Sequence, residues 1–170
     1  MVKTLVDKGY GYDTADGVYF NIKKFKNYGK LSKTKISKAK TGTRVETDKY
    51  DKQHAFDFAL WKKAKPNEPF WHSPFGAGRP GWHIECSVMG KKKVAEQLDI
   101  HGGAIDLIFP HHQNEIAQSE AFDNKQPYVK YWLHTGFLNV RGTKMSKSLG
   151  NFITIPALLA NYDPKVFRFF

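Results

Sequence analysis

Apolar residues are spaced differently in the first third of the chain and in the rest. Residues 10–22 contain two runs rich in aromatic and β-branched residues around Asp16 and Gly17, which predicts an antiparallel hairpin. Residues 23–53 then alternate lysine with serine, threonine and glycine, and this pattern predicts a basic excursion on the surface. Alternating apolar residues follow and predict a buried strand near 57–61.

The second part of the chain has the pattern of alternating strands and helices. Proline and glycine recur through residues 66–81 and predict a loop without regular structure. Beyond it, apolar spacing predicts helices over 82–98, after Pro110, from Pro156 and from about Asp163, and strands near 99–102 and 132–138. This alternation implies an α/β fold with a parallel sheet of the strands near 57–61, 99–102 and 132–138, to which the hairpin adds an antiparallel part.

Charge changes the picture of the first third. The 170 residues carry a formal net charge of +11, and residues 1–65 hold 16 Lys and Arg against 7 Asp and Glu. Such a basic segment suggests a partner with a phosphate backbone. A solvated, lysine-rich surface explains the same charge equally well.

Composition excludes several classes of protein. Hydrophobic residues make up 41% of the chain, which excludes disorder throughout. A single Cys excludes a disulfide scaffold and fits a reducing cytoplasm. No apolar run approaches the ~20 residues of a membrane span, and residues 1–9 lack the apolar core of a secretory signal. We therefore expect a cytoplasmic protein without a membrane partner.

Three residues have the chemistry of a metal site. His111 and Glu115 are four residues apart on the helix expected after Pro110, so they face one side of it. With the thiolate of Cys86, they form a ligand set that suits Zn²⁺. His-x3-Glu spacing is also common by chance, and a small buried thiol is the structural alternative for Cys86. His112 points about 100° away and would supply packing or a hydrogen bond.

A lysine-rich loop is the second candidate. Lys144-Met-Ser-Lys-Ser-Leu-Gly-Asn151 places two ammonium groups in a segment that is bounded by Gly150. Ammonium groups that reach from a loop can neutralise charge that develops on a phosphoryl group. The alternative is a soluble loop of no chemical consequence.

These stretches resemble a known family. The loop at 144–148 resembles the signature loop of class I aminoacyl-tRNA synthetases, and residues 76–87, 99–119 and 131–136 resemble the cysteinyl-tRNA synthetases specifically. The resemblance covers essentially the whole chain and is weakest over 23–53. The chain departs from the family pattern at Gln113, where a glutamate is usual.

The resemblance implies an organisation in two parts. Residues 1–55 correspond to part of a basic connective insertion with a β-hairpin. Residues 56–170 correspond to the second, C-terminal half of the catalytic domain, with the zinc-ligand residues and the lysine loop. The implied fold is a partial Rossmann-like parallel sheet with helices, plus the antiparallel hairpin insertion.

The resemblance also implies roles for single residues. Cys86, His111 and Glu115 match three of the family's four zinc ligands. Trp82 and His101 match residues beside the substrate cysteine. Residues that match the nucleotide site are Gly103, Asp106, His134 and Gly136. Lys144 and Lys147 match the lysines that stabilise charge on the phosphates, and Lys147 also matches the lysine assigned to ATP.

The implied reaction is ATP-dependent activation of cysteine to cysteinyl-adenylate, with Mg²⁺, followed by transfer to tRNA(Cys). In the family, zinc holds the substrate thiolate. The family's His-x-Gly-His motif, its first zinc-ligand cysteine and its helical anticodon domain have no match here. We therefore expect these 170 residues alone to be inactive.

Two alternatives remain at this point. A related ligase joins cysteine to an amino sugar in mycothiol synthesis, and it shares the zinc, the adenylate chemistry and the lysine loop. The lysine-rich first third favours the tRNA enzyme. The other alternative is a non-catalytic module that binds zinc or RNA.

Overall fold

The computed structural model describes residues 1–34 and 56–169, which fall into two compact units. The first unit comprises Met1–His134 and the second Thr135–Phe170. Most of the basic excursion expected over 23–53 lies outside the described residues, which include only its first part, with a 3-10 turn at Ile22–Lys24. None of the helices in the described ranges is long and apolar enough to cross a membrane.

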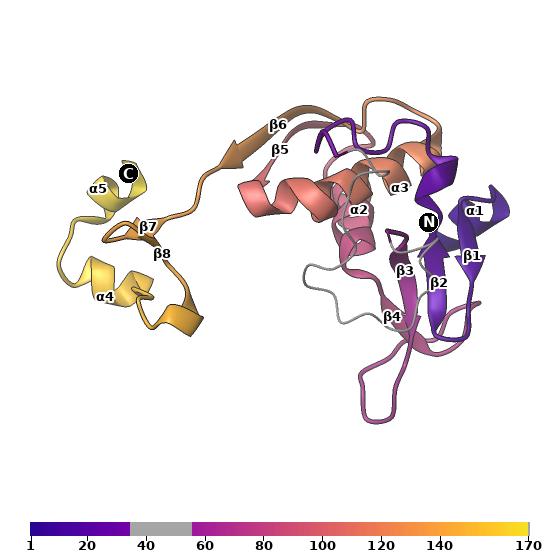
Figure 1. The fold of residues 1–170 in the computed structure, drawn as a ribbon, viewed down its shortest axis with the longest axis horizontal. Helices are drawn as coiled ribbons and strands as arrows, with labels where there is room; N and C mark the ends of the chain where they lie inside the picture. The colour runs from indigo at the N-terminus through magenta and orange to yellow at the C-terminus, as the bar shows by residue number, and fades with distance from the viewer. Residues whose placement is uncertain (35–55, 170) are drawn as a thin grey trace. The chain divides into compact units, whose positions relative to one another are not determined.

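A four-stranded antiparallel sheet forms one side of the first unit (Figure 1). Its order is β1 (Gly11–Asp13), β2 (Gly17–Phe20), β3 (Phe58–Lys63) and β4 (Gly78–Pro80). β1 and β2 form the expected hairpin, with Tyr12 opposite Tyr19. Gly17 is required because a Cβ there would collide with the carbonyl oxygen of Trp61 on β3.

Two expectations about this sheet are wrong. The strand near 57–61 exists as β3, but it pairs antiparallel with β2 and β4 instead of joining a parallel sheet. Its burial alternates at Phe58, Ala59 and Leu60, as it does in a sheet with one solvated face. Residues 66–81 are also not wholly irregular, because Gly78–Pro80 forms β4. Proline is tolerated there because β4 is an edge strand.

The remaining elements of the first unit are helical, apart from a second sheet. They are α1 (Val2–Asp7), α2 (Trp82–Lys93), β5 (Leu98–Ala104), a 3-10 turn (Ile105–Leu107), a turn at Ile108–His112, α3 (Gln113–Asp123) and β6 (Val129–Thr135). β5 and β6 form a two-stranded parallel sheet, which confirms the α/β class. β6 begins and ends three residues earlier than expected.

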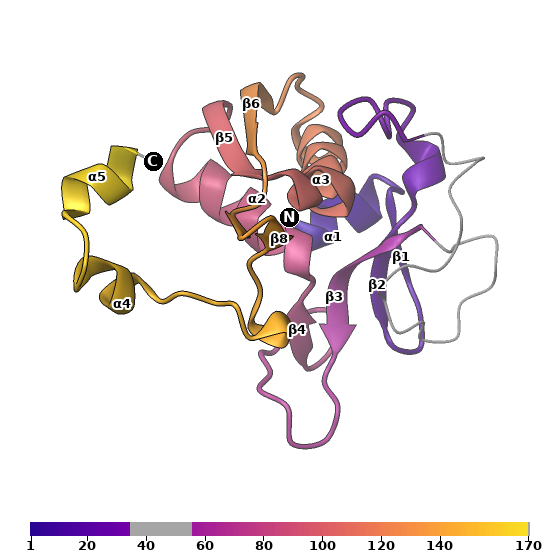
Figure 2. The ribbon, with the colours of Figure 1, turned by 60° about the vertical axis from the view of Figure 1, so that its left-hand side comes forward.

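The core lies between the antiparallel sheet and the helices α1, α2 and α3 (Figure 2). Phe20 of β2 is fully buried and stacks on Phe58, with ring centroids 4.9 Å apart. Ile84 of α2 and Ala117 of α3 complete this contact from the helical side. Most other buried residues of α3 are polar, including Asn114, Gln118 and Ser119. Buried polar side chains need hydrogen-bond or ligand partners, so their number on α3 points to a functional site on this helix.

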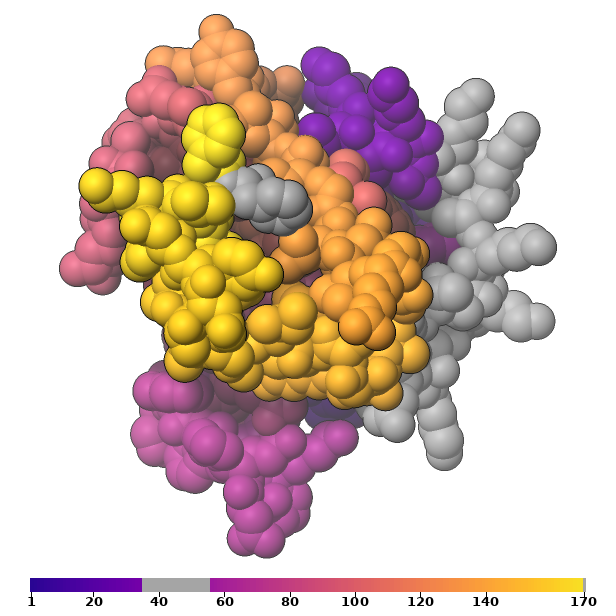
Figure 3. Space-filling model, turned by 90° about the vertical axis from the view of Figure 1, so that its left-hand side faces the viewer, coloured from indigo at the N-terminus to yellow at the C-terminus, as the bar shows by residue number. Residues whose placement is uncertain are grey.

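The second unit is small and carries the lysine loop. It contains the antiparallel pair β7 (Asn139–Val140) and β8 (Thr143–Lys144), a 3-10 turn (Lys147–Leu149), α4 (Ile155–Leu159) and α5 (Pro164–Phe169). The two expected final helices are thus present. Many apolar side chains of this unit, drawn orange to yellow in Figure 3, are exposed; they include Phe152, Ile155, Tyr162 and Val166.

Candidate metal centre

Two helix N-termini place the candidate ligands. α2 begins directly after Gly81, whose backbone N–H donates to Leu60 O at 2.9 Å. A Cβ on Gly81 would collide with the carbonyl oxygen of Ala59, so only glycine lets α2 start this close to β3. The first turns of α2 then carry His83 and Cys86. The turn at Ile108–His112 and the start of α3 carry His111 and Glu115.

The three predicted ligands converge. One ligand atom each from Cys86, His111 and Glu115 lie within 4.8 Å of one another. The four-residue spacing also has the expected consequence, because His111 Nε2 lies 3.0 Å from Glu115 Oε1. The predicted convergence is therefore confirmed, with the cysteine from α2, His111 from the turn at Ile108–His112 and Glu115 from α3.

The carboxylate of Glu115 is the most unusual group in the cluster. Its side chain is 0% exposed. Oε1 is close to two imidazoles, at 3.3 Å from His101 Nε2 and 3.0 Å from His111 Nε2, whereas Oε2 has no hydrogen-bond partner among the residues that the structure describes. Burial raises the pKa of Glu115, but the hydrogen bonds from the two histidines outweigh it and leave the pKa below its ordinary value. Glu115 is thus an ionised, buried carboxylate with one free oxygen.

The neighbouring histidines do not all neutralise this charge. Burial lowers the pKa of His83 to about 3 and that of His112 to about 4, so both imidazoles are neutral near pH 7. Burial also raises the pKa of the Cys86 thiol, and the negative charge of Glu115 raises it further. A cation bound here would satisfy Glu115 Oε2 and would favour the Cys86 thiolate. The donor set therefore fits a zinc ion.

Aromatic rings pack against His111 and against the neighbouring His101 and His112. His83 Nδ1 lies 2.9 Å from His111 Nδ1, which leaves Nε2 of His111 on the side of Glu115. The indole of Trp82 stacks on the His111 ring at 4.5 Å and is 57% exposed. Trp132 of β6 contacts the rings of His101 and His112, at 4.9 and 4.8 Å. The contacts with Trp82 and His83 hold the ring of the ligand His111 in its orientation.

Sequence reasoning missed two members of this cluster, His83 and Trp132. A signal for His83 was available, because it lies three residues before Cys86 and so shares a helix face with it. For Trp132 the signal was its place in the resembling stretch 131–136, and spacing gave none, because its partners His101 and His112 belong to β5 and to the turn before α3.

Of the other predicted site residues of the first unit, His134 and Gly103 lie against this cluster. His134 Nε2 lies 2.8 Å from His112 Nδ1. A Cβ on Gly103 would come within 2.8 Å of His112 Cε1, so the backbone there lies directly against the ring. Asp106 lies exposed in the 3-10 turn after β5.

The predicted lysines and Gly136 belong to the second unit. Asn151 ties the loop into a closed turn: its Oδ1 accepts from Ser146 N at 2.9 Å and its Nδ2 donates to Lys144 O at 3.1 Å. Gly150 has a φ of +66°, which favours glycine. Both ammonium groups lie over aromatic rings, Lys144 over Phe137 and Lys147 over Phe152. Both lysines are exposed and therefore accessible to an anion.

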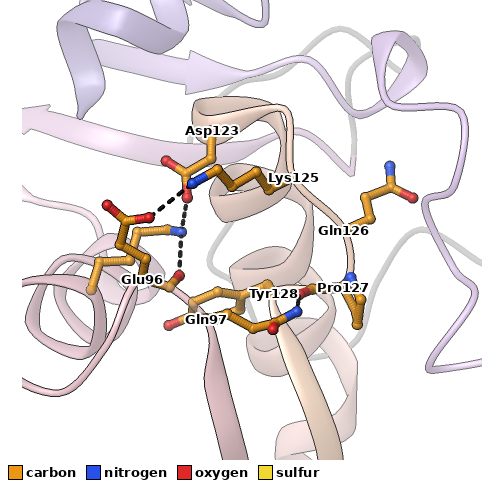
Figure 4. Close-up of a pocket in the computed structure, with 8 residues that line it drawn as sticks. Glu96, Gln97, Asp123, Lys125, Gln126, Pro127 and Tyr128 are labelled. Carbon is orange, nitrogen blue, oxygen red and sulfur yellow. Dashed lines mark hydrogen bonds and ion pairs between the residues drawn. The ribbon is translucent and has the colours of Figure 1, made fainter.

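A separate cavity of about 350 Å³ lies where α2 and α3 end (Figure 4). Lys91 is its central group: its ammonium pairs with Asp123, donates to Glu96 O at 3.1 Å and lies 4.9 Å from the Tyr128 ring centroid. Lys125 and Glu96 form a further pair, which is exposed. The charged side chains of this cavity thus pair with one another and tie the ends of the two helices together.

Removing one partner of the Lys91–Asp123 pair is expected to destabilise the first unit. The two side chains are only 13% and 18% exposed, so Asp123→Asn leaves a poorly solvated ammonium unpaired. We expect the free energy of unfolding to fall by about 1–3 kcal/mol, less than for a fully buried pair. Urea unfolding of Asp123→Asn and of the unchanged chain measures this difference in the free energy of unfolding. Lys125→Met is the matched control, and a loss as large as that of Asp123→Asn would contradict the assignment.

The buried histidines predict how stability depends on pH. Burial holds the pKa of His83 at about 3 in the folded, metal-free chain. Between about pH 6.5 and pH 3, this imidazole therefore takes up a proton only when the chain is unfolded. The free energy of unfolding therefore falls as the pH drops from 6.5, by up to about 1.4 kcal/mol per pH unit from this group. Above pH 6.5 the group contributes no slope. Urea unfolding at a series of pH values in a chelator should show a shallower acid slope for His83→Gln than for the unchanged chain, and an equal slope would contradict the prediction.

Comparison with known proteins places this geometry in context. Residues 1–170 match the family described as tRNA synthetases class I (C) catalytic domain. The chain is 63% identical over 170 residues to the cysteine–tRNA ligase of Pyrococcus furiosus, 61% to that of Pyrococcus abyssi and 59% to that of Methanococcus maripaludis. Each match covers 100% of this chain and 35% of the relative's length.

Proposed function

Because the chain belongs to the family of class I (C) tRNA synthetase catalytic domains, we propose that it supplies part of the active site of a cysteine–tRNA ligase. The observation that carries this is the convergence of Cys86, His111 and Glu115 in a chain about 60% identical to ligases with that name. The chain spans 35% of those relatives. The proposed reaction, cysteine activation with ATP and Mg²⁺ and then transfer to tRNA(Cys), therefore belongs to a whole protein.

Cys86, His111 and Glu115 are the proposed zinc ligands. The unpartnered Oε2 of Glu115 supports this, because a buried carboxylate oxygen needs a donor or a cation. When bound, zinc would supply a coordination bond to the thiolate of the substrate cysteine, which a serine hydroxyl matches poorly. The exposed indole of Trp82, stacked on His111, would cover the bound amino acid, with His101 beside it.

Gly103, Asp106, His134 and Gly136 are the proposed nucleotide-binding residues. Lys144 and Lys147 are proposed to stabilise charge on the phosphates while the carboxylate of cysteine attacks the α-phosphate and pyrophosphate leaves. The support is chemical, since both ammonium groups are exposed and the loop backbone is held by Asn151.

The proposed organisation keeps residues 1–55 as part of a connective insertion and residues 56–170 as the second half of the catalytic domain. Residues on both sides of position 55 share one core, as the stacking of Phe20 on Phe58 illustrates. The insertion would therefore be anchored to the catalytic half by packing.

A chimera tests the proposed function. Residues 1–170 would replace the matched segment of the Pyrococcus furiosus relative, which is 63% identical. We expect cysteine-dependent ATP–pyrophosphate exchange from the chimera and none from the 170-residue chain alone. The chain alone has the lysine loop but no match to the His-x-Gly-His motif, and one of these two elements cannot by itself position ATP for the reaction. Exchange that depends on another amino acid, or a folded chimera without exchange, would contradict the proposal.

A further inference from the structure

We propose that His101, His112 and Glu115 form a second position for a divalent first-row transition metal ion, beside the Cys86 position and without a sulfur ligand. One ligand atom from each of these residues lies within 4.8 Å of the others. Two imidazoles and one carboxylate form a donor set that such ions accept. This inference does not depend on the ligase function, because it concerns only which ions the chain binds.

The two histidines are held in place from outside the trio. The His101 ring meets the His112 ring edge-on, with centroids 4.8 Å apart at an interplanar angle of 64°. Trp132 packs against both rings, and His134 holds His112 through Nδ1. A ligand ring that is fixed by neighbours loses little conformational freedom when an ion binds, which favours binding.

Glu115 is the residue that the two positions share. Its Oε1 lies between His101 and His111, the histidines of the two different trios, and its fully buried Oε2 has no partner within residues 1–34 and 56–169. A carboxylate has two oxygens and can serve two adjacent ions. The sulfur-containing trio suits Zn²⁺, whereas the nitrogen and oxygen trio also suits Co²⁺ and Ni²⁺.

Cobalt binding to the 170-residue chain separates the two positions. Equilibrium dialysis with elemental analysis counts bound Co²⁺, and the thiolate-to-cobalt charge-transfer absorption reports the Cys86 position alone. For Cys86→Ser, we expect the absorption to be lost while one equivalent of cobalt stays bound. Adding His112→Ala to this variant should weaken the remaining binding at least about 10-fold. Adding His72→Ala instead, at an exposed histidine outside the cluster, should leave the remaining cobalt binding of Cys86→Ser unchanged.

The reverse variants complete the test. With Cys86 intact, His112→Ala should keep the charge-transfer absorption and lose one cobalt equivalent. If His112→Ala fails to fold by circular dichroism, His101→Gln takes its place, because His101 is 24% exposed and tolerates change better. The proposal is overturned if Cys86→Ser binds no cobalt, if His112→Ala leaves its residual binding unchanged, or if the histidine variants abolish the absorption as Cys86→Ser does.

Discussion

Glu115→Gln is expected to lower the affinity of the chain for Zn²⁺ by more than about 100-fold, because even residues behind a metal ligand contribute 10- to 100-fold. Glutamine fills the same space but has no charge, and the cation would lose the only carboxylate of the proposed Cys86, His111 and Glu115 site. Competition with a chromogenic chelator at pH 7 measures the change, and circular dichroism shows whether the variant folds.

Glu120→Gln is the matched control for this change. Glu120 lies on the same helix, is also buried, and accepts a hydrogen bond from Tyr128 N at 3.1 Å, away from the cysteine and histidines. Its substitution should leave the zinc affinity within about threefold, well inside the effect of losing a ligand. If Glu115→Gln binds zinc as tightly as the unchanged chain, Glu115 is not a ligand.

Phe20→Ala is expected to cost about 3–5 kcal/mol of the free energy of unfolding, the usual range for a buried phenylalanine. Phe20 is 0% exposed and stacks between Tyr10 and Phe58, with ring centroids 5.8 and 4.9 Å away. Its removal would leave a cavity between the antiparallel sheet and the helices that carry the metal ligands. The measurement is urea unfolding followed by circular dichroism.

Phe70→Ala is the control, because it makes the same substitution at a side chain that is 50% exposed. We expect it to change stability by less than about 0.5 kcal/mol, as surface substitutions do. A loss of less than about 1 kcal/mol for Phe20→Ala would show that this ring is not part of the rigid core. Since the sheet supports α2, the zinc affinity of Phe20→Ala should also fall when the chain is partly unfolded.

The sequence alone determined those features that depend on near neighbours along the chain. Asp16 and Gly17 predicted the β1–β2 hairpin, and apolar spacing predicted α3 and α2. The helix expected over 82–98 was too long, because α2 ends at Lys93 and Leu98 begins β5. The interval of four residues predicted the contact of His111 with Glu115, because an α-helix brings such residues to one face. The resemblance of whole stretches to the family also rests on the sequence alone, and so does the proposed role of the lysine loop.

Only the tertiary structure decided which distant segments meet. The residues of β3 predicted a strand, but its antiparallel pairing with β2 and β4 depends on hydrogen bonds between segments far apart in sequence. The same holds for Cys86, which reaches Glu115 because α2 packs on α3. His101 and Trp132 join the cluster because β5 lies beside β6. Local spacing determines which side chains share one face of a helix or strand. Which other helix or strand packs against that face depends on how the whole chain buries its apolar surface, and the local pattern does not specify it.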